Sequence, residues 1–236
     1  MNKTGNPWSR WDPTQLAAPR RCLFCGEAEV SGLCRPCLGE LEPLGSKGCR
    51  RCGNPAVHRD AETCRWCDRL KGLPDELCSL YAYREMGMAV FRKIKYGGYY
   101  RLLNPMLKPN RALFFEKISF LEYNCLVPVP ETFKSKFERY FNPAALIADR
   151  LSRISGIPSR PRLAISPRAR RQVGLTYEER RKNTKNRFRA RGVTDRDAVI
   201  LVDDVLTSGA TLAAATRVLR RAGVRRIAWF TLFRTP

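Results

Sequence analysis

Eight of the ten cysteines form four C-x-x-C pairs, a spacing at which two thiolates can bind one metal ion. A glycine follows the second cysteine of the first and third pairs, and these two Cys-x-x-Cys-Gly segments lie 27 residues apart. Glycine tolerates positive φ, which allows a tight turn to close around an ion. The chain therefore contains an internal repeat of one small metal-binding unit. Its pairs are Cys22/Cys25, Cys34/Cys37, Cys49/Cys52 and Cys64/Cys67.

Zinc is the metal that this donor set favours. Zn²⁺ binds four thiolates in a tetrahedron, and a site with four protein ligands keeps no open position for catalysis. Because a unit this short buries little apolar surface, the metal would contribute its folding free energy. We expect two structural zinc sites formed by consecutive pairs, with interleaved pairs or iron–sulfur clusters as the alternatives. The other two cysteines, Cys78 and Cys125, are expected to be small buried residues.

A second segment combines carboxylates and hydroxyls at the end of an apolar run. Residues 198–202 precede Asp203 and Asp204, and a short polar loop then leads into a helical pattern. A helix N-terminus presents unpaired N–H groups and a positive dipole end, which favour a phosphate. Carboxylates can accept hydrogen bonds from sugar hydroxyls or help to hold Mg²⁺. The segment thus predicts a sugar-phosphate site. Its loop residues are Thr207, Ser208, Gly209, Ala210 and Thr211.

Alternating strand and helix patterns place this segment in an α/β domain. Strands are expected at residues 124–129, 198–202 and 227–233, and helices at 142–155 and 211–222. This order predicts a parallel sheet with helical crossovers, whose ligands bind at the carboxyl ends of the strands. Two other interpretations are that the aspartates only cap the next helix, or that they end a Walker B strand. The second fails because the chain has no G-x-x-x-x-G-K-[ST] sequence.

Charge and cysteine content divide the chain of 236 residues, whose formal net charge is +22. Residues 20–78 carry ten basic and nine acidic side chains, whereas residues 79–236 carry 32 and 12. We expect a flexible tail at 1–19, a double zinc ribbon at 20–78 and an α/β domain at 79–236. Within that domain, residues 79–121 would form a hood over the sheet edge and residues 122–236 the core.

Nothing in the sequence indicates a membrane span or export. The longest uncharged stretch, residues 205–216, is too short to cross a bilayer. The first nineteen residues contain no apolar run of the kind found in signal peptides. We therefore expect a cytoplasmic protein. In that compartment the cysteine pairs are better interpreted as metal ligands than as disulfides.

Several motifs now resemble those of a known family. Residues 199–212 resemble the phosphoribosyl pyrophosphate (PRPP) motif of type I phosphoribosyltransferases, and residues 20–236 resemble the ComF (ComFC) family. That family joins a double zinc ribbon to a type I phosphoribosyltransferase domain, an α/β fold with a parallel sheet and flanking helices. Further matching segments are Lys95-Tyr96-Gly97-Gly98, Val127-Pro128-Val129-Pro130, Arg139-Tyr140-Phe141-Asn142-Pro143-Ala144 and Gln172-Val173-Gly174-Leu175.

The resemblance implies roles for individual residues. Asp203 and Asp204 would bind the ribose hydroxyls of PRPP, which would arrive with Mg²⁺, and residues 207–211 would cradle its 5′-phosphate. Lys134 would contact the pyrophosphate. A mobile loop around residues 170–172 would close over the site, and the reaction would displace pyrophosphate at ribose C1. The implied catalytic residues are Asp203, Asp204, Arg170 and Arg171.

Departures from the family pattern favour PRPP binding over turnover. Pro167 and Ala169 stand where the family often has arginine and threonine, just before the mobile loop. Two functions therefore compete. One is Mg²⁺-dependent phosphoribosyl transfer to an acceptor that the sequence does not identify. The other is a non-catalytic nucleic-acid-binding module that uses the fold only to sense PRPP or to bind polyanions.

Clustered basic residues favour a polyanionic partner. Residues 150–191 contain 14 basic and two acidic side chains. The plain alternative is a solvated basic surface. The ComF family is linked to DNA uptake in natural transformation, so the resemblance implies cytoplasmic single-stranded DNA as a partner. The low net charge of the zinc ribbon indicates that it stabilises the adjacent domain or contacts a protein partner.

Overall fold

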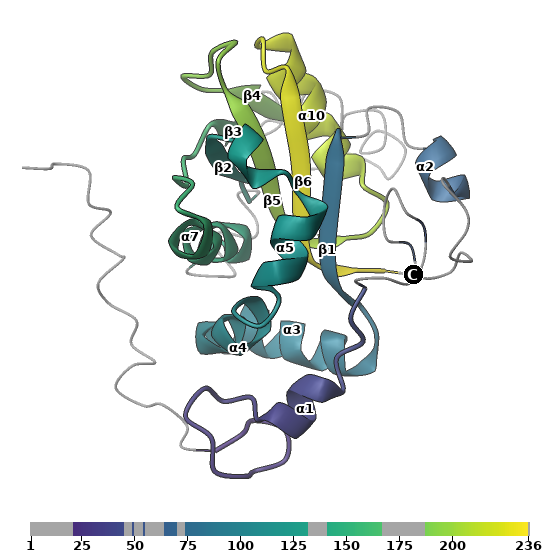
Figure 1. Cartoon of the computed structure of the whole chain (residues 1–236), viewed down its shortest axis with the longest axis vertical. Helices are drawn as coiled ribbons and strands as arrows, with labels where there is room; N and C mark the ends of the chain where they lie inside the picture. The colour runs from purple at the N-terminus through teal and green to yellow at the C-terminus, as the bar shows by residue number, and fades with distance from the viewer. Residues whose placement is uncertain are drawn as a thin grey trace, which may run out of the picture.

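The described part of the chain is built around one parallel sheet. The computed structural model describes residues 21–44, 49, 54, 64–69, 74–131, 141–166 and 187–235, so the tail predicted at 1–19 lies outside it. The sheet has four strands in the order β1-β6-β5-β2 (Figure 1). They are β1 (Glu76–Ala82), β2 (Cys125–Pro128), β5 (Ala198–Leu206) and β6 (Arg226–Arg234). This confirms the predicted α/β class with a parallel sheet.

The edge strand β1 was not among the predicted strands. It pairs in parallel with β6, from Glu76 opposite Ala228 to Ala82 opposite Arg234. Its sequence, ELCSLYA, contains no β-branched residue, which explains why its pattern carried little strand signal. β1 also continues across the boundary predicted between residues 78 and 79. Cys78 in β1 and Cys125 in β2 are both buried, as expected.

Alternate residues of the central strands face two separate hydrophobic cores. Ile200 and Val202 of β5 face the first core, together with helices α5 (Arg111–Lys117) and α7 (Pro143–Ser155). Val199 and Leu201 face the second, together with α10 (Ala210–Arg221). In Figure 1, α5 crosses the face of the sheet turned toward the viewer. Because both faces are covered, β5 is a continuous apolar run up to its aspartates.

Local signals set the ends of the two predicted helices. Asn142 caps α7 by accepting the Ala144 N–H at 2.9 Å, and Gly156 ends that helix in the left-handed conformation. Gly209 precedes α10 and Gly223 follows it, both at positive φ. The helices therefore occupy the predicted ranges to within one residue.

Helical segments connect β1 to β2. They pack on the sheet in the first core, where Phe91, Leu103 and Phe114 are buried. A separate antiparallel pair, β3 (Leu163–Ile165) with β4 (Phe188–Ala190), joins the second core through Leu163 and Phe188. The connecting helices other than α5 are α3 (Glu85–Gly97), η3 (Tyr100–Leu102), α4 (Leu103–Leu107) and η4 (Phe120–Glu122).

The two cysteine modules contact different parts of the domain. The first, with α1 (Arg35–Gly39), runs beside β1, where Leu44 N–H donates to the Leu80 carbonyl at 2.9 Å. The second contains α2 (Arg65–Arg69), which lies well away from α1 in Figure 1. Across the described ranges, no helix has both the length and the hydrophobicity to cross a membrane.

Candidate functional site

The aspartate pair lies inside β5 rather than after it, which corrects the predicted strand end at residue 202. Pairing with β6 continues from Asp203 opposite Thr231 to Leu206 opposite Arg234. On the other side, β2 ends at Pro128 opposite Val202. The last four residues of β5 therefore have a strand neighbour on one side only. The carboxylates lie at this half-open edge, at the carboxyl end of the sheet.

Both carboxylates accept hydrogen bonds from the local backbone. The Asp204 N–H donates to Asp203 Oδ1 at 2.9 Å, and the Val205 N–H donates to Asp204 Oδ1 at 2.7 Å. Burial, reinforced by the neighbouring Asp204 charge, raises the pKa of Asp203 well above its ordinary value. A cation or a hydroxyl donor bound between the two carboxylates would relieve this repulsion.

The loop after β5 has the geometry of an anion-binding turn. Thr207 and Ser208 are exposed, and Gly209 is the N-cap of α10 with φ 73° and ψ 0°. That left-handed conformation is costly for residues with a Cβ, which explains the glycine. Ala210 and Thr211 follow in the first turn of α10, where backbone N–H groups lack intrahelical partners. The structure therefore brings residues 203–211 to one edge.

Arg187 is a site residue that the sequence interpretation missed. Its Nη1 donates to Thr211 Oγ1 at 3.4 Å. Burial lowers the pKa of Arg187, and the nearby Asp203 carboxylate opposes that shift. Its Nε is buried without a hydrogen-bond partner among the described residues. A guanidinium beside the first turn of α10 adds positive charge where the phosphate is predicted. The Arg-rich composition of residues 150–191 was the only signal for it.

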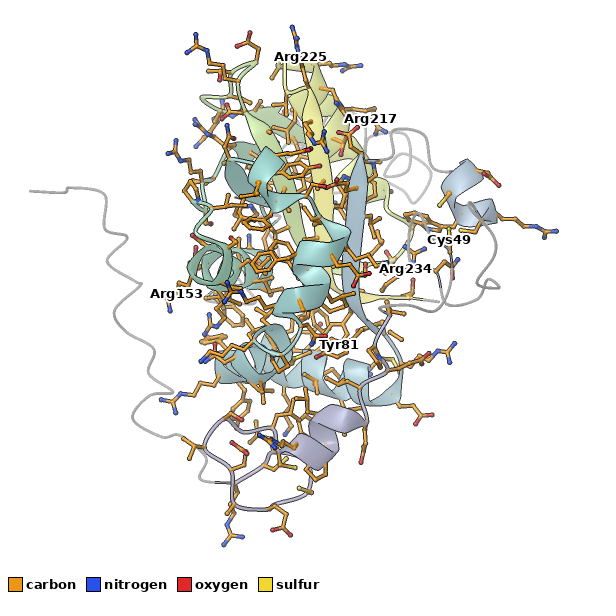
Figure 2. All side chains as sticks on the ribbon, in the orientation of Figure 1. Cys49, Tyr81, Arg153, Arg217, Arg225 and Arg234 are labelled. Carbon is orange, nitrogen blue, oxygen red and sulfur yellow. The ribbon has the colours of Figure 1, made fainter. Side chains whose placement is uncertain are left out.

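Trp66 is a second residue that was missed, and it comes from the zinc-ribbon segment. Its Nε1–H donates to the Thr207 carbonyl at 3.3 Å. Its ring lies 4.2 Å from the Arg234 guanidinium, measured to the ring centroid. The ring also packs against Cys49, Cys64 and Cys67, and Figure 2 labels Cys49 and Arg234 in the same part of the molecule. The second cysteine module therefore lies next to the loop of residues 207–211, called here the phosphate loop because a phosphate is predicted to bind there. The only signal for Trp66 in the sequence was its position between Cys64 and Cys67.

The described cysteines gather in consecutive rather than interleaved sets. One set is Cys22, Cys25, Cys34 and Cys37, and the other contains Cys49, Cys64 and Cys67, with the sulfurs of each set within 4.8 Å of one another. Neighbouring sulfurs lie 3.5 Å apart for Cys25–Cys34 and 3.8 Å apart for Cys64–Cys67.

These distances suit a tetrahedral metal site. Four sulfurs bound to one Zn²⁺ would lie about 3.8 Å from each other, whereas a disulfide needs about 2.05 Å. Four thiolates around one ion also leave no position for a substrate, so the chemistry of the donor set is that of structural zinc. The fourth predicted ligand of the second set, Cys52, lies outside the described residues. So do the predicted ligand contact Lys134 and the predicted catalytic residues Arg170 and Arg171.

Comparisons with domain families agree with this architecture. A double zinc ribbon domain matches residues 14–79, and a phosphoribosyl transferase domain matches residues 142–236. Among solved structures, a purine phosphoribosyltransferase from Pyrococcus horikoshii covers 55% of this chain and 83% of its own. Its identity of 17% and TM-score of 0.35 are too low to support an argument.

Two curated competence proteins match nearly the whole chain. Competence protein ComFC of Bacillus subtilis is 30% identical over 220 residues, which cover 91% of this chain and 89% of that protein. Competence protein F of Haemophilus influenzae is 27% identical over 222 residues, which cover 88% and 93%. Because these matches extend through both the cysteine modules and the sheet, this chain belongs to the ComF family, in which a double zinc ribbon precedes a phosphoribosyltransferase domain.

Proposed function

We propose that this protein binds PRPP, accompanied by Mg²⁺, at the turn between β5 and α10. One observation carries the proposal: a carboxylate pair and a helix N-terminus preceded by a left-handed glycine meet at one sheet edge. The carboxylates suit the hydroxyl-bearing face of a ribose, and the helix N-terminus suits its 5′-phosphate. None of these groups alone is specific for a phosphorylated pentose. Together, within nine residues, they match both the hydroxyls and the phosphate of such a ligand.

Each described residue then has a defined task. Asp203 and Asp204 accept hydrogen bonds from the ribose hydroxyls, and residues 207–211 surround the phosphate with backbone N–H groups and hydroxyls. Arg187, beside Thr211, supplies positive charge. Carboxylate oxygens are also the donors that Mg²⁺ prefers, so the aspartates fit a magnesium ion bound together with the ligand. Bound Mg²⁺ would neutralise the charge of the leaving pyrophosphate.

The two competing functions differ in whether the protein catalyses a reaction after it binds PRPP. In a transfer reaction, the bond from ribose C1 to the pyrophosphate oxygen breaks, and a bond from C1 to the acceptor forms. The protein would hold the ribose phosphate in place while the acceptor approaches. In the non-catalytic alternative, the same residues only sense PRPP. Release of pyrophosphate in the presence of candidate acceptor bases distinguishes the two.

Titration calorimetry with Mg²⁺ and PRPP tests the binding site directly. Asp204→Ala should weaken PRPP binding by about tenfold to a hundredfold, the effect of losing a hydrogen bond to a charged group. Asp149→Ala, at an exposed position on α7, is the matched control and should bind as the wild type does. Wild-type protein that contains zinc but takes up no PRPP at millimolar concentration would refute the proposal.

A second function, binding of single-stranded DNA, is favoured by a group of unpaired arginines. These five residues make no ion pair within the described ranges, and four of them are exposed, Arg217 being half-buried. They lie on or beside β4 and α10, which pack against each other, or just before β6. The group, called here the arginine face, is Arg189, Arg191, Arg217, Arg221 and Arg225.

The arginine face begins next to the phosphate loop, because Arg187, the residue before β4, donates a hydrogen bond to Thr211. Figure 2 shows Arg217 and Arg225 at the end of the molecule away from α1. Guanidinium groups that lack acidic partners are available to phosphates. The competence proteins named above suggest that the polyanion is DNA, and we infer handling of single-stranded DNA in the cytoplasm during natural transformation. A protein partner for the zinc ribbon stays a prediction.

The salt dependence of DNA affinity tests this second function. Each phosphate contact to a single strand contributes about 0.7 to the slope of log affinity against log salt. The double variant Arg217→Gln/Arg221→Gln should therefore reduce the slope by roughly 1.4. Arg153→Gln, at an exposed position on α7, is the control for a general loss of charge. Equal slopes for the wild type and the double variant would refute the arginine face as the DNA site.

A further inference from the structure

Trp66 connects the second cysteine set to the phosphate loop. It is the second residue of α2 and lies between Arg65 and Cys67. Its indole N–H donates to the backbone carbonyl of Thr207, the first residue after β5. Its ring packs against both the cluster of Cys49, Cys64 and Cys67 and the second core of the main domain. One side chain thus contacts the metal module, the domain core and the loop.

The same ring also touches the strand that supports the loop. The guanidinium of Arg234 lies over Trp66, and Arg234 is 1% exposed, so its position is set by packing. Arg234 stands opposite Leu206 in the pairing of β6 with β5. Thr235, the residue that follows β6, donates its N–H to the Leu206 carbonyl at 2.9 Å. Trp66 therefore contacts Thr207 directly and also Arg234, the partner of the residue before it.

The helix that carries Trp66 cannot hold its position alone. α2 has five residues, well below the length at which an isolated helix is stable in water. Cys64 immediately precedes α2 and Cys67 lies within it, and both belong to the second sulfur set. A metal bound there would fix both ends of the turn that presents the indole. The first sulfur set instead belongs to the first core, which includes Cys22, Cys34 and Cys37.

We propose that the second cysteine set positions the phosphate-binding loop through Trp66, so that metal at this set controls the order of residues 207–211. The first set has no such role. Trp66 is a positioning residue, because it acts on the ligand only through the Thr207 carbonyl and Arg234. The consequence for ligand affinity rests on the proposed PRPP function, whereas the effect on loop order does not.

Hydrogen–deuterium exchange of the full-length, zinc-loaded protein without PRPP measures loop order directly. Trp66→Phe keeps an aromatic ring over Arg234 and removes the N–H donor. It should raise exchange in peptides covering residues 207–211 by about threefold to tenfold, the range expected for one hydrogen bond. Trp66→Ala should raise exchange further. Arg65→Ala, an exposed neighbour on α2, is the control and should leave exchange unchanged.

Two further measurements separate positioning from general destabilisation. The zinc content of Trp66→Phe should match the wild type, since no sulfur ligand is changed. Its melting temperature should fall by less than about 4 °C, since an aromatic ring still packs against the second core. Cys64→Ser, which removes a sulfur from the second set, should accelerate loop exchange, whereas Cys37→Ser in the first set should not. Equal acceleration by both cysteine variants, or unchanged loop exchange in Trp66→Phe, would overturn the proposal.

A PRPP titration of the same variants completes the test. If wild-type protein binds PRPP, Trp66→Phe should weaken binding by the same factor as it raises loop exchange. If the wild type does not bind PRPP, the proposed function fails, and the exchange data still decide whether the second cysteine set orders the loop.

Discussion

Replacing Gly209 by alanine tests the phosphate loop at its most constrained position. Gly209 has φ 73° and ψ 0°, and Gly156 at the end of α7 has nearly the same backbone, with φ 79° and ψ −8°. An L-residue with a Cβ pays about 1–2 kcal/mol in this conformation. A Cβ at Gly156 would meet no heavy atom within 4 Å, so Gly156→Ala measures the conformational cost alone.

Both variants should therefore lose about 1–2 kcal/mol of stability. For a chain of this size, each kcal/mol lowers the melting temperature by about 2–4 °C, so the expected loss is about 2–8 °C for either variant. Only Gly209→Ala should also lose PRPP affinity. An alanine that relaxes toward negative φ turns the following N–H groups away from the phosphate, and one lost charge-assisted hydrogen bond corresponds to about tenfold to hundredfold weaker binding.

Differential scanning fluorimetry and titration calorimetry, run on both variants, give the two readings. The informative quantity is the difference between the variants, because their backbone penalties match. If Gly209→Ala and Gly156→Ala bind PRPP with equal affinity, the left-handed glycine before α10 has no part in phosphate binding. The assignment of the loop would then be wrong.

Three further predictions address the carboxylates, the core and the metals. Because the pKa of Asp203 is raised in the folded protein by burial and by Asp204, folding stability falls as pH rises above the ordinary pKa of an aspartate. Asp203→Asn should therefore melt higher than the wild type at pH 8, with a smaller gap at pH 5; a gap that does not change with pH would contradict this. In the wild type, the buried Trp229 N–H donates to the Thr216 hydroxyl at 2.8 Å. Thr216→Val removes this acceptor and should lower the free energy of unfolding, measured with denaturant, by about 1–3 kcal/mol. Thr216→Ser keeps a hydroxyl and should lower it less. Metal analysis of purified protein should find two zinc ions per chain and one in Cys37→Ser; a full complement in that variant would exclude Cys37 as a ligand.

Some of the site followed from the sequence because the groups that form it are close neighbours in the chain. The carboxylate pair, the glycine and the start of α10 occupy nine residues, and a strand followed by a helix brings any such segment to the sheet edge. The C-x-x-C spacing is likewise local, since one turn brings both sulfurs to the same ion. Burial on both faces made the apolar run of β5 recognisable. Its end was misplaced because pairing with β6 continues through the two aspartates to Leu206.

The remaining features depend on contacts between distant segments, and local patterns carry no information about those. β1 is a strand because it pairs with the edge of β6, whereas its own residues carry little strand propensity. Arg187 reaches Thr211 across 24 residues, and Trp66 reaches Thr207 across 141. The sequence by itself determined which groups the chain carries: its thiolate pairs, its adjacent carboxylates and the loop that is predicted to bind a phosphate. Only the tertiary structure decided that the second cysteine module lies against the phosphate loop, because chain topology and packing, rather than residue spacing, bring those surfaces together.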